Sequence, residues 1–378
     1  MTDVFSTLPP ELLFDIFARE VELRPTAVTL NRQLAPFARM SAYREIRVTT
    51  RALAKLGHSL AAAPYLGELI DSLQVVDDGQ VTLDEPRDTE GELLAFELMS
   101  NLRKLKVTSH DLGGFLSDAR LQTYAFQHSI HTLILHSEPT TPYSALRNLH
   151  LSPCLRDLTI TSPMRFLTVD RAVPSVFSPS ALEVIRISSE PSSEFTAFFD
   201  SLASLSSLQL SSTDSDLRRV FSALGTRARS SLKRIDFNTF SHLSSNIDDA
   251  LSVGFAPLEE LTLWSSQSDI SPLFFHNLSS HLPQLRRLYF RGPASDFLDH
   301  IVGFLSDVES TPAGLEILSV DVGIGSSPVV LSSEDRRVGE VKRLAEACRA
   351  IGVRLEGSIL VALEVLRSSS EQRAIVIA

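Results

Sequence analysis

The 378-residue sequence contains little cysteine and no long apolar run. Its two cysteines, Cys154 and Cys348, lie far apart and form no Cys-x-x-Cys pair. This spacing predicts neither a disulfide framework nor a zinc cluster, and it fits a reducing compartment. No stretch of about 18 apolar residues occurs, and the first residues show no basic segment followed by an apolar one. We therefore expect no membrane contact and a cytoplasmic or nuclear location.

Positive charge is also in short supply. The chain has 35 Lys and Arg against 46 Asp and Glu, a formal net charge of -11. Nucleic-acid affinity depends largely on a surplus of basic side chains that neutralise phosphates, so we expect no nucleic-acid partner. The hydrophobic share of 43% and the charged share of 21% are instead typical of a folded protein with a large core.

Motifs that carry catalysis are missing as well. The sequence has neither a Gly-x-Ser-x-Gly elbow nor a His-Glu-x-x-His pair. Gly323 and Gly325 follow an apolar segment, but Pro328 stands where the third glycine of a dinucleotide loop belongs. His131 and His136 are close in sequence, yet strand alternation places them at different positions of a repeat. We expect no enzyme activity, no cofactor and no metal site.

What the chain does contain is a repeated pattern, apolar-x-x-apolar-x-apolar. Nine copies begin at Leu102, Ile130, Leu155, Leu182, Leu205, Leu232, Leu258, Leu285 and Leu315. Their spacing of 23 to 30 residues matches the period of about 20 to 29 expected for leucine-rich repeats. An earlier copy begins at Ile70, ahead of an insertion at residues 77–92, and residues 351–355 are expected to form a last strand. In each copy, alternation places two apolar side chains on the buried face of a short strand.

The array resembles the leucine-rich-repeat family, although the Asn that usually follows the strand is absent from most copies. The resemblance implies an α/β solenoid, a curved parallel sheet with helices on its convex side. Helical spacing of apolar residues predicts helices at 195–202, 217–224, 297–305 and 334–350. We expect the solenoid to cover residues 49–378 and to end in a helical cap.

Ahead of the repeats, residues 6–48 resemble the F-box family, in the fungal style that is joined to leucine-rich repeats. The resemblance is carried by Leu8-Pro9-x-Glu11-Leu12-Leu13-x-x-Ile16-Phe17, by Asn31-Arg32-x-Leu34-x-Pro36-Phe37-Ala38-Arg39 and by Tyr43-Arg44-Glu45-Ile46. It implies that residues 1–48 form a helical F-box-like segment. It also implies that the Skp-type linker subunit of a cullin-containing ubiquitin ligase is contacted by Leu8, Pro9, Glu11, Leu12, Ile16 and Phe17.

Two interpretations of this start stay open. In the first, the chain is the substrate adaptor of an Skp-cullin-F-box ligase in the ubiquitin conjugation pathway, and the repeats bind a protein substrate. In the second, it is a ligase-independent scaffold whose N-terminal helices only cap the first repeat, as terminal repeats require. The second is favoured by the stretch between Arg19 and Thr29, which is shorter than in the F-box family and has no cysteine.

Stacked repeats would align their outward residues in columns across the sheet. One column, between the second and third apolar positions, is Lys106, Ile134, Thr159, Arg186, Gln209, Asp236, Thr262, Tyr289 and Ser319. The column after the third apolar position is Thr108, His136, Thr161, Ser188, Ser211, Asn238, Trp264, Arg291 and Asp321. Interface hot spots favour Trp, Tyr and Arg. We therefore predict substrate binding by Arg186, Asp236, Trp264, Tyr289 and Arg291, with packing of Trp264 over a repeat edge as the alternative.

Overall fold

The computed structural model describes residues 42–76, 88–108, 130–136, 154–161, 181–187, 202–212, 224, 226–239, 254–265, 272–292, 297–307, 311–322, 329–331, 336–360 and 375–377. The chain divides into two compact units, residues 1–171 and residues 172–378. Each unit is built on parallel strands that follow one another in chain order, twelve such strands in all. This is a solenoid fold of the leucine-rich-repeat type.

The first unit contains the strands β1 (Glu45–Thr49), β2 (Ser72–Val76), β3 (Lys104–Thr108), β4 (Thr132–His136) and β5 (Asp157–Ile160). They pair in parallel, with equivalent repeat positions directly opposite one another, as Leu105 lies opposite Leu133. Leu105, Leu133 and Leu158 have no exposed surface, whereas the residues between the buried ones are half-buried on the other face. The alternation expected from the sequence is therefore present.

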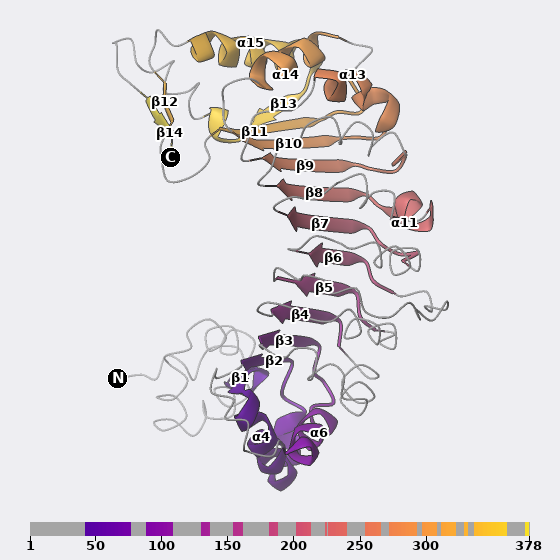
Figure 1. Ribbon diagram of the computed structural model, residues 1–378, viewed down its shortest axis with the longest axis vertical. Helices are drawn as coiled ribbons and strands as arrows, with labels where there is room; N and C mark the ends of the chain where they lie inside the picture. Colours follow the sequence, from indigo (N-terminus) through magenta and orange to yellow (C-terminus); the bar gives the residue numbers. More distant parts are fainter. Residues whose placement is uncertain are drawn as a thin grey trace, which may run out of the picture. The chain divides into compact units, whose positions relative to one another are not determined.

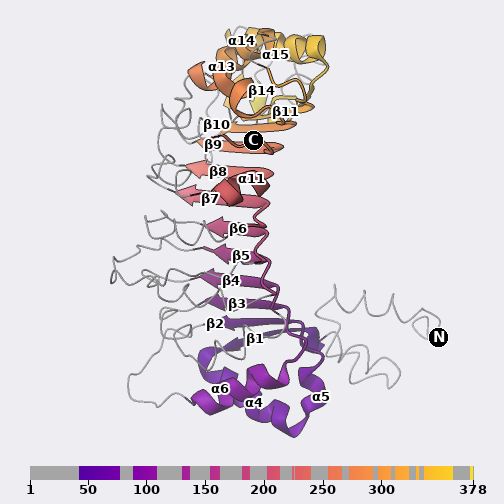
Figure 2. The ribbon, with the colours of Figure 1, turned by 90° about the vertical axis from the view of Figure 1, so that its right-hand side faces the viewer.

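Three helices accompany these strands: α4 (Thr50–Ala62), α5 (Pro64–Gly67) and α6 (Thr89–Leu98), which Figure 2 shows grouped near β1. The Thr49 hydroxyl begins α4 by accepting a hydrogen bond from the amide of Ala52 (3.2 Å). Asp88 begins α6 by accepting from the amide of Gly91 (3.0 Å), and its other oxygen lies 2.9 Å from Nε2 of His58. These two contacts hold the pKa of Asp88 below its ordinary value.

The second unit contains β6 (Val184–Ile187), β7 (Ser207–Ser212), β8 (Arg234–Thr239), β9 (Glu260–Ser265), β10 (Arg287–Gly292), β11 (Ile317–Val322) and β13 (Arg354–Glu356). Its helices are α11 (Thr226–Ser231), α13 (Pro272–His281), α14 (Phe297–Ser306) and α15 (Arg336–Ile351), and a separate antiparallel pair joins β12 (Val329–Leu331) to β14 (Ile375–Ile377). Figure 1 shows α13, α14 and α15 gathered beside β10, β11 and β13.

Aromatic side chains fill the core between these helices and the sheet. Phe290 of β10 lies 5.4 Å from Phe275 and 6.5 Å from Phe274, measured between ring centroids. Phe275 also meets Phe304 of α14 at 5.6 Å. Such tilted and edge-on pairs add to the hydrophobic burial of the rings. The face of β10 that carries Phe290 is thus packed against α13, and the opposite face of the strands, here called the open face, carries the outward columns.

The repeat prediction is confirmed: all nine copies, the earlier copy at Ile70 and the last strand form strands of the sheet. The helices predicted at 297–305 and 334–350 are α14 and α15. Those predicted at 195–202 and 217–224 lie outside the described residues, apart from the buried Leu202 and Leu224. Helix α6 begins inside the expected insertion and was not predicted.

The start of the sheet differs from the expected boundary at residue 48. Residues 42–44 are helical, but β1 begins at Glu45, inside the segment expected to be a helical F-box-like domain. Ile46 lies opposite Leu73 and Val48 opposite Val75, so these branched side chains continue the inward columns of the repeats, where at this edge strand both are half-buried. The remainder of the F-box-like segment lies outside the described residues.

Candidate protein-binding site on the open face of β7 to β11

The open face of the second unit brings outward residues of neighbouring strands into direct opposition. Asp236 of β8 lies opposite Thr262 of β9, which lies opposite Tyr289 of β10. One step further along the strands, Asn238 lies opposite Trp264, which lies opposite Arg291. The columns predicted from the sequence are therefore real neighbours here, because the parallel strands pair without a shift in register.

These strands surround a cavity of about 370 Å³ on the open face. Its lining consists of Gln209, Arg234, Asp236, Asn238, Thr262, Trp264, Tyr289, Phe290, Arg291 and Asp321. Pockets for whole small ligands run from about 300 to 1,000 Å³, so this one lies at the small end of that range. It is large enough for one protruding side chain and too small for a helix.

One wall of the cavity is formed by an arginine stacked on the single tryptophan of the chain. The guanidinium carbon of Arg291 lies 4.7 Å from the ring centroid of Trp264. A cation over an indole ring at this distance is attracted by the negative face of the ring, typically by about 0.5–1 kcal/mol at exposed sites. Trp264 remains half-buried on the open face, where it borders the cavity.

The part of the lining on β8 carries two acceptors for which the described residues supply no donor. Burial raises the pKa of Asp236, and the charge of Arg234 opposes this rise only in part. The described residues supply neither a hydrogen bond nor an ion pair to the Asp236 carboxylate. The side-chain oxygen of Asn238 is buried and likewise has no partner among them. Such groups cost folding stability, so their presence in a cavity indicates a place where something else donates.

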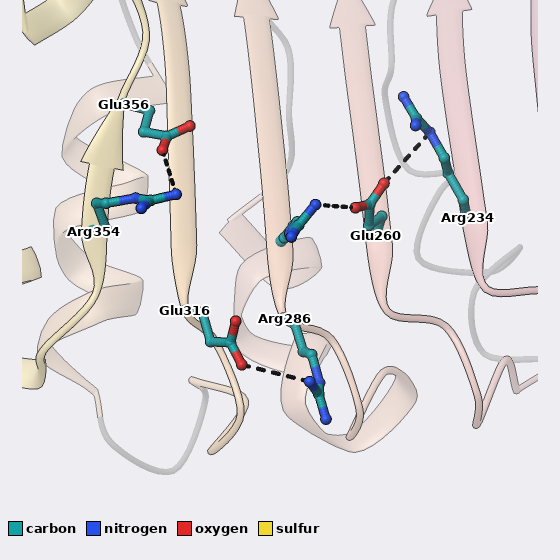
Figure 3. Close-up of polar contacts among 7 residues, drawn as sticks. Arg234, Glu260, Arg286, Glu316, Arg354 and Glu356 are labelled. Atoms are coloured by element: carbon teal, nitrogen blue, oxygen red, sulfur yellow. Dashed lines mark hydrogen bonds and ion pairs between the residues drawn. The ribbon is translucent and has the colours of Figure 1, made fainter.

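Arg234 is the natural partner for Asp236, but a ladder of ion pairs at the strand starts engages it elsewhere. Glu260 lies 3.5 Å from Arg234 and 2.7 Å from Arg287, so one carboxylate joins three strands (Figure 3). The next row pairs Lys233 with Glu259 at 3.4 Å and Arg286 with Glu316 at 3.6 Å. These pairs are largely exposed and each contributes little stability. For the cavity, the consequence of these pairs is that Arg234 forms its ion pair with Glu260 and not with Asp236.

At the far end of the cavity, Asp321 has a structural partner. Its Oδ1 accepts a hydrogen bond from the amide of Ser358 (2.7 Å), directly after the turn at Gly357. Gly357 has a φ of +95°, and a Cβ there would collide with the carbonyl of Val320. Asp321 therefore fixes the turn that follows β13, which leaves Asp236 as the carboxylate of the cavity without a partner among the described residues.

The structure brings together four of the five predicted substrate-binding residues. Asp236, Trp264, Tyr289 and Arg291 line one cavity, whereas Arg186 lies on β6, opposite Gln209, and does not line it. Asn238 also lines the cavity; the sequence placed it in an outward column but did not predict a role in binding. Arg234 belongs to the outward column one step earlier along the strands. In that column the charge alternates between Arg234, Glu260 and Arg287, a pattern from which its position in an ion-pair network could have been predicted. All six predicted linker-binding residues lie outside the described residues.

Two other functional features are absent from the described residues. They contain no group of three or more His, Cys, Asp or Glu placed to hold a metal ion. No helix among them is both long and apolar enough to cross a membrane. His136 instead lies 3.0 Å from the hydroxyl of Thr161, measured from Nδ1, so it links β4 to the end of β5.

Comparison with known proteins gives a distant likeness among solved structures. No family model matches the chain. No curated protein matches it either. Among solved structures, it is similar to an internalin from Listeria monocytogenes, at 14% identity and a TM-score of 0.36, over 94% of this chain and 98% of that one. At this level of likeness, the fold assignment depends on the parallel strands and their register in this chain.

Proposed function

We propose that the chain is a protein-recognition adaptor whose open sheet face, at β7 to β11, binds a protein partner. The observation that carries this proposal is the cavity in which Trp264, Tyr289 and Arg291 stand side by side with Asp236, a carboxylate to which the described residues supply no partner. Tryptophan, tyrosine and arginine are the residues most enriched among binding hot spots, and they dominate affinity where they cluster. Parallel-strand solenoids also present a broad surface for this purpose.

We further propose that the partner is a substrate delivered to an Skp-cullin-F-box ubiquitin ligase. The support for this step is the resemblance of residues 6–48 to the F-box family, with Leu8, Pro9, Glu11, Leu12, Ile16 and Phe17 facing the linker subunit. In this arrangement the chain itself performs no chemistry. It joins the linker at one end to a substrate on the open face.

The alternative is a ligase-independent scaffold, and one observation favours it. Strand β1 begins at Glu45, so the end of the F-box-like segment is already part of the first repeat. The helices predicted ahead of this strand from the sequence would then serve to cover it, which is what an end repeat needs irrespective of any linker.

Co-purification of the full chain with an Skp-type linker separates these two candidates. The ligase proposal predicts a stoichiometric complex that is lost in the double variant Leu8→Ala, Pro9→Ala, because those side chains would be buried against the linker. Tyr289→Ala, on the open face, is the matched control and should keep the linker. If the wild-type chain forms no complex, or the double variant binds equally well, the ligase role is wrong and the scaffold stands.

A further inference from the structure

Two hydrogen-bond acceptors on β8, the side chains of Asp236 and Asn238, line the cavity on the open face, and the described residues supply no donor to them. Asp236 and Asn238 are two residues apart on β8, so both project from the same face of the strand. Their Cα atoms are then separated by roughly 7 Å, twice the rise per residue of a strand. Both side chains line the cavity. The Asn238 oxygen is buried, whereas Asp236 is half-buried, so Asp236 is the acceptor that an entering donor meets first.

The charge balance of the lining shows which kind of donor fits. The lining contains two arginines, Arg234 and Arg291, and two aspartates, Asp236 and Asp321. Arg234 is shared with Glu260, Arg291 lies over Trp264, and Asp321 accepts from the Ser358 amide. Of these four charged groups, Asp236 is the one to which the described residues supply no hydrogen bond, ion pair or ring contact. An incoming anion would meet this carboxylate, and an incoming neutral group would leave it desolvated and unpaired.

We propose that this cavity is a subsite for a basic side chain, preferably arginine, presented by an extended segment of the protein partner. The inference rests on the adaptor function proposed above and names the chemistry that the same site recognises. Arginine offers five N–H donors in a planar fork, which can bind a carboxylate such as that of Asp236 through two parallel hydrogen bonds. Its apolar stem can lie along Trp264, as amphipathic side chains do on aromatic surfaces.

The volume of the cavity and the form of the sheet favour a side chain of a polypeptide as the occupant. A space of about 370 Å³ holds one long side chain, while the backbone that carries it runs over the surrounding polar rim. That rim includes Gln209, Thr262 and Tyr289, whose side chains offer both donors and acceptors to a peptide backbone. The surplus of acidic residues in the chain, a net charge of -11, attracts a basic partner over longer range.

Because Trp264 is the only tryptophan in the chain, its fluorescence reports on this cavity alone. The experiment titrates the full chain with the capped peptide Gly-Gly-Arg-Gly-Gly, and in parallel with peptides that carry lysine, citrulline or glutamate in place of arginine. We expect a saturable fluorescence change with arginine, a weaker one with lysine and none with citrulline or glutamate. Citrulline is the sharpest comparison, since it keeps the shape of arginine without its charge.

Two variants, each of which removes one negative charge, test whether the arginine peptide binds at Asp236. Asp236→Asn should weaken binding of the arginine peptide by about tenfold or more, as expected for loss of a charged hydrogen bond. Glu316→Gln removes a carboxylate of the same unit that does not line the cavity, and it should change the affinity by no more than about twofold. The melting temperature of Asp236→Asn should not fall, because its burial is unfavourable for the charge, so lost binding cannot be attributed to unfolding.

Several results would overturn the proposal. Equal responses to the arginine and citrulline peptides would show that charge plays no part, and no response to any peptide would show that the cavity does not accept a free segment. Tighter binding of free arginine than of the peptide would assign the cavity to a small molecule. None of these outcomes affects complex formation with the linker, so a failure of this subsite is distinguishable from a failure of the ligase role.

Discussion

The two units of the chain have the same kind of inward residue, buried and apolar, and differ in the residues that point outward. In the first unit, the open-face column of β3 to β5 is Lys106, Ile134 and Thr159, and its nearby His136 hydrogen-bonds Thr161. The corresponding column of β8 to β10 in the second unit is Asp236, Thr262 and Tyr289, beside Trp264 and an Asn238 oxygen without a donor. Inward residues therefore build the same repeat in both units, whereas the candidate binding site lies in the second.

The strongest test of this equivalence is truncation of matching inward leucines, Leu133→Ala on β4 and Leu288→Ala on β10. Both side chains have no exposed surface, so each variant should lose about 2–5 kcal/mol of unfolding free energy through lost burial and a residual cavity. Urea denaturation, followed for each unit by hydrogen exchange, measures the loss. A loss below 1 kcal/mol in one unit alone would show that the repeats are not equivalent.

Replacing a helical glycine by alanine should lower the stability of the first unit at Gly57 and raise the stability of the second unit at Gly303. Gly57 of α4 lies so close to Gly91 of α6 that an added Cβ would collide with the Gly91 carbonyl, and Gly57→Ala should cost about 1–3 kcal/mol. Gly303 of α14 has open space around it, so Gly303→Ala should stabilise by about 0.5–1 kcal/mol. Thermal unfolding of both variants checks the signs, and a stabilised Gly57→Ala would contradict the close helix contact.

A smaller effect is expected from the open face of the second unit, and its sign depends on pH. Burial raises the pKa of Asp236 above its ordinary 3.8, so its contribution to stability is present at low pH and is lost as pH rises through the folded-state pKa. Asp236→Asn should therefore melt at the same temperature as the wild type, or slightly higher, at pH 7. This advantage should disappear below pH 3.8. Thr159→Ala, in the first unit, should show no such pH dependence.

The smallest effect should come from the ion-pair ladder. Glu260→Gln leaves Arg234 and Arg287 without their shared carboxylate, but all three side chains reach solvent. We expect a slight fall in melting temperature at low salt that vanishes in 1 M NaCl, where charges are screened beyond about 3 Å. The sharper readout is peptide binding: with Arg234 released toward Asp236, the arginine peptide should bind more weakly. An unchanged peptide affinity in Glu260→Gln would mean that Arg234 forms no ion pair with Asp236 once Glu260 is removed.

Much of the fold followed from the spacing of leucines. The copy at Leu285 predicted that Leu288 and Phe290 would be buried and Tyr289 outward, and the structure agrees. The start of the sheet at Glu45 was not predicted, because an edge strand with one neighbour carries only a short apolar alternation. Helix α6 was also missed, since its glycine contact with α4 leaves no periodic apolar stripe to recognise.

For the candidate site, the sequence by itself determined the columns. Strand residues alternate between two faces, and parallel strands in register place equivalent positions side by side, so Trp264 and Arg291 had to be neighbours. Only the tertiary structure decided which polar groups are satisfied. Arg234 lies near both Asp236 and Glu260, and it pairs with Glu260 because that carboxylate is also held by Arg287. Hydrogen bonding and burial depend on all neighbours at once, which a repeat pattern does not contain.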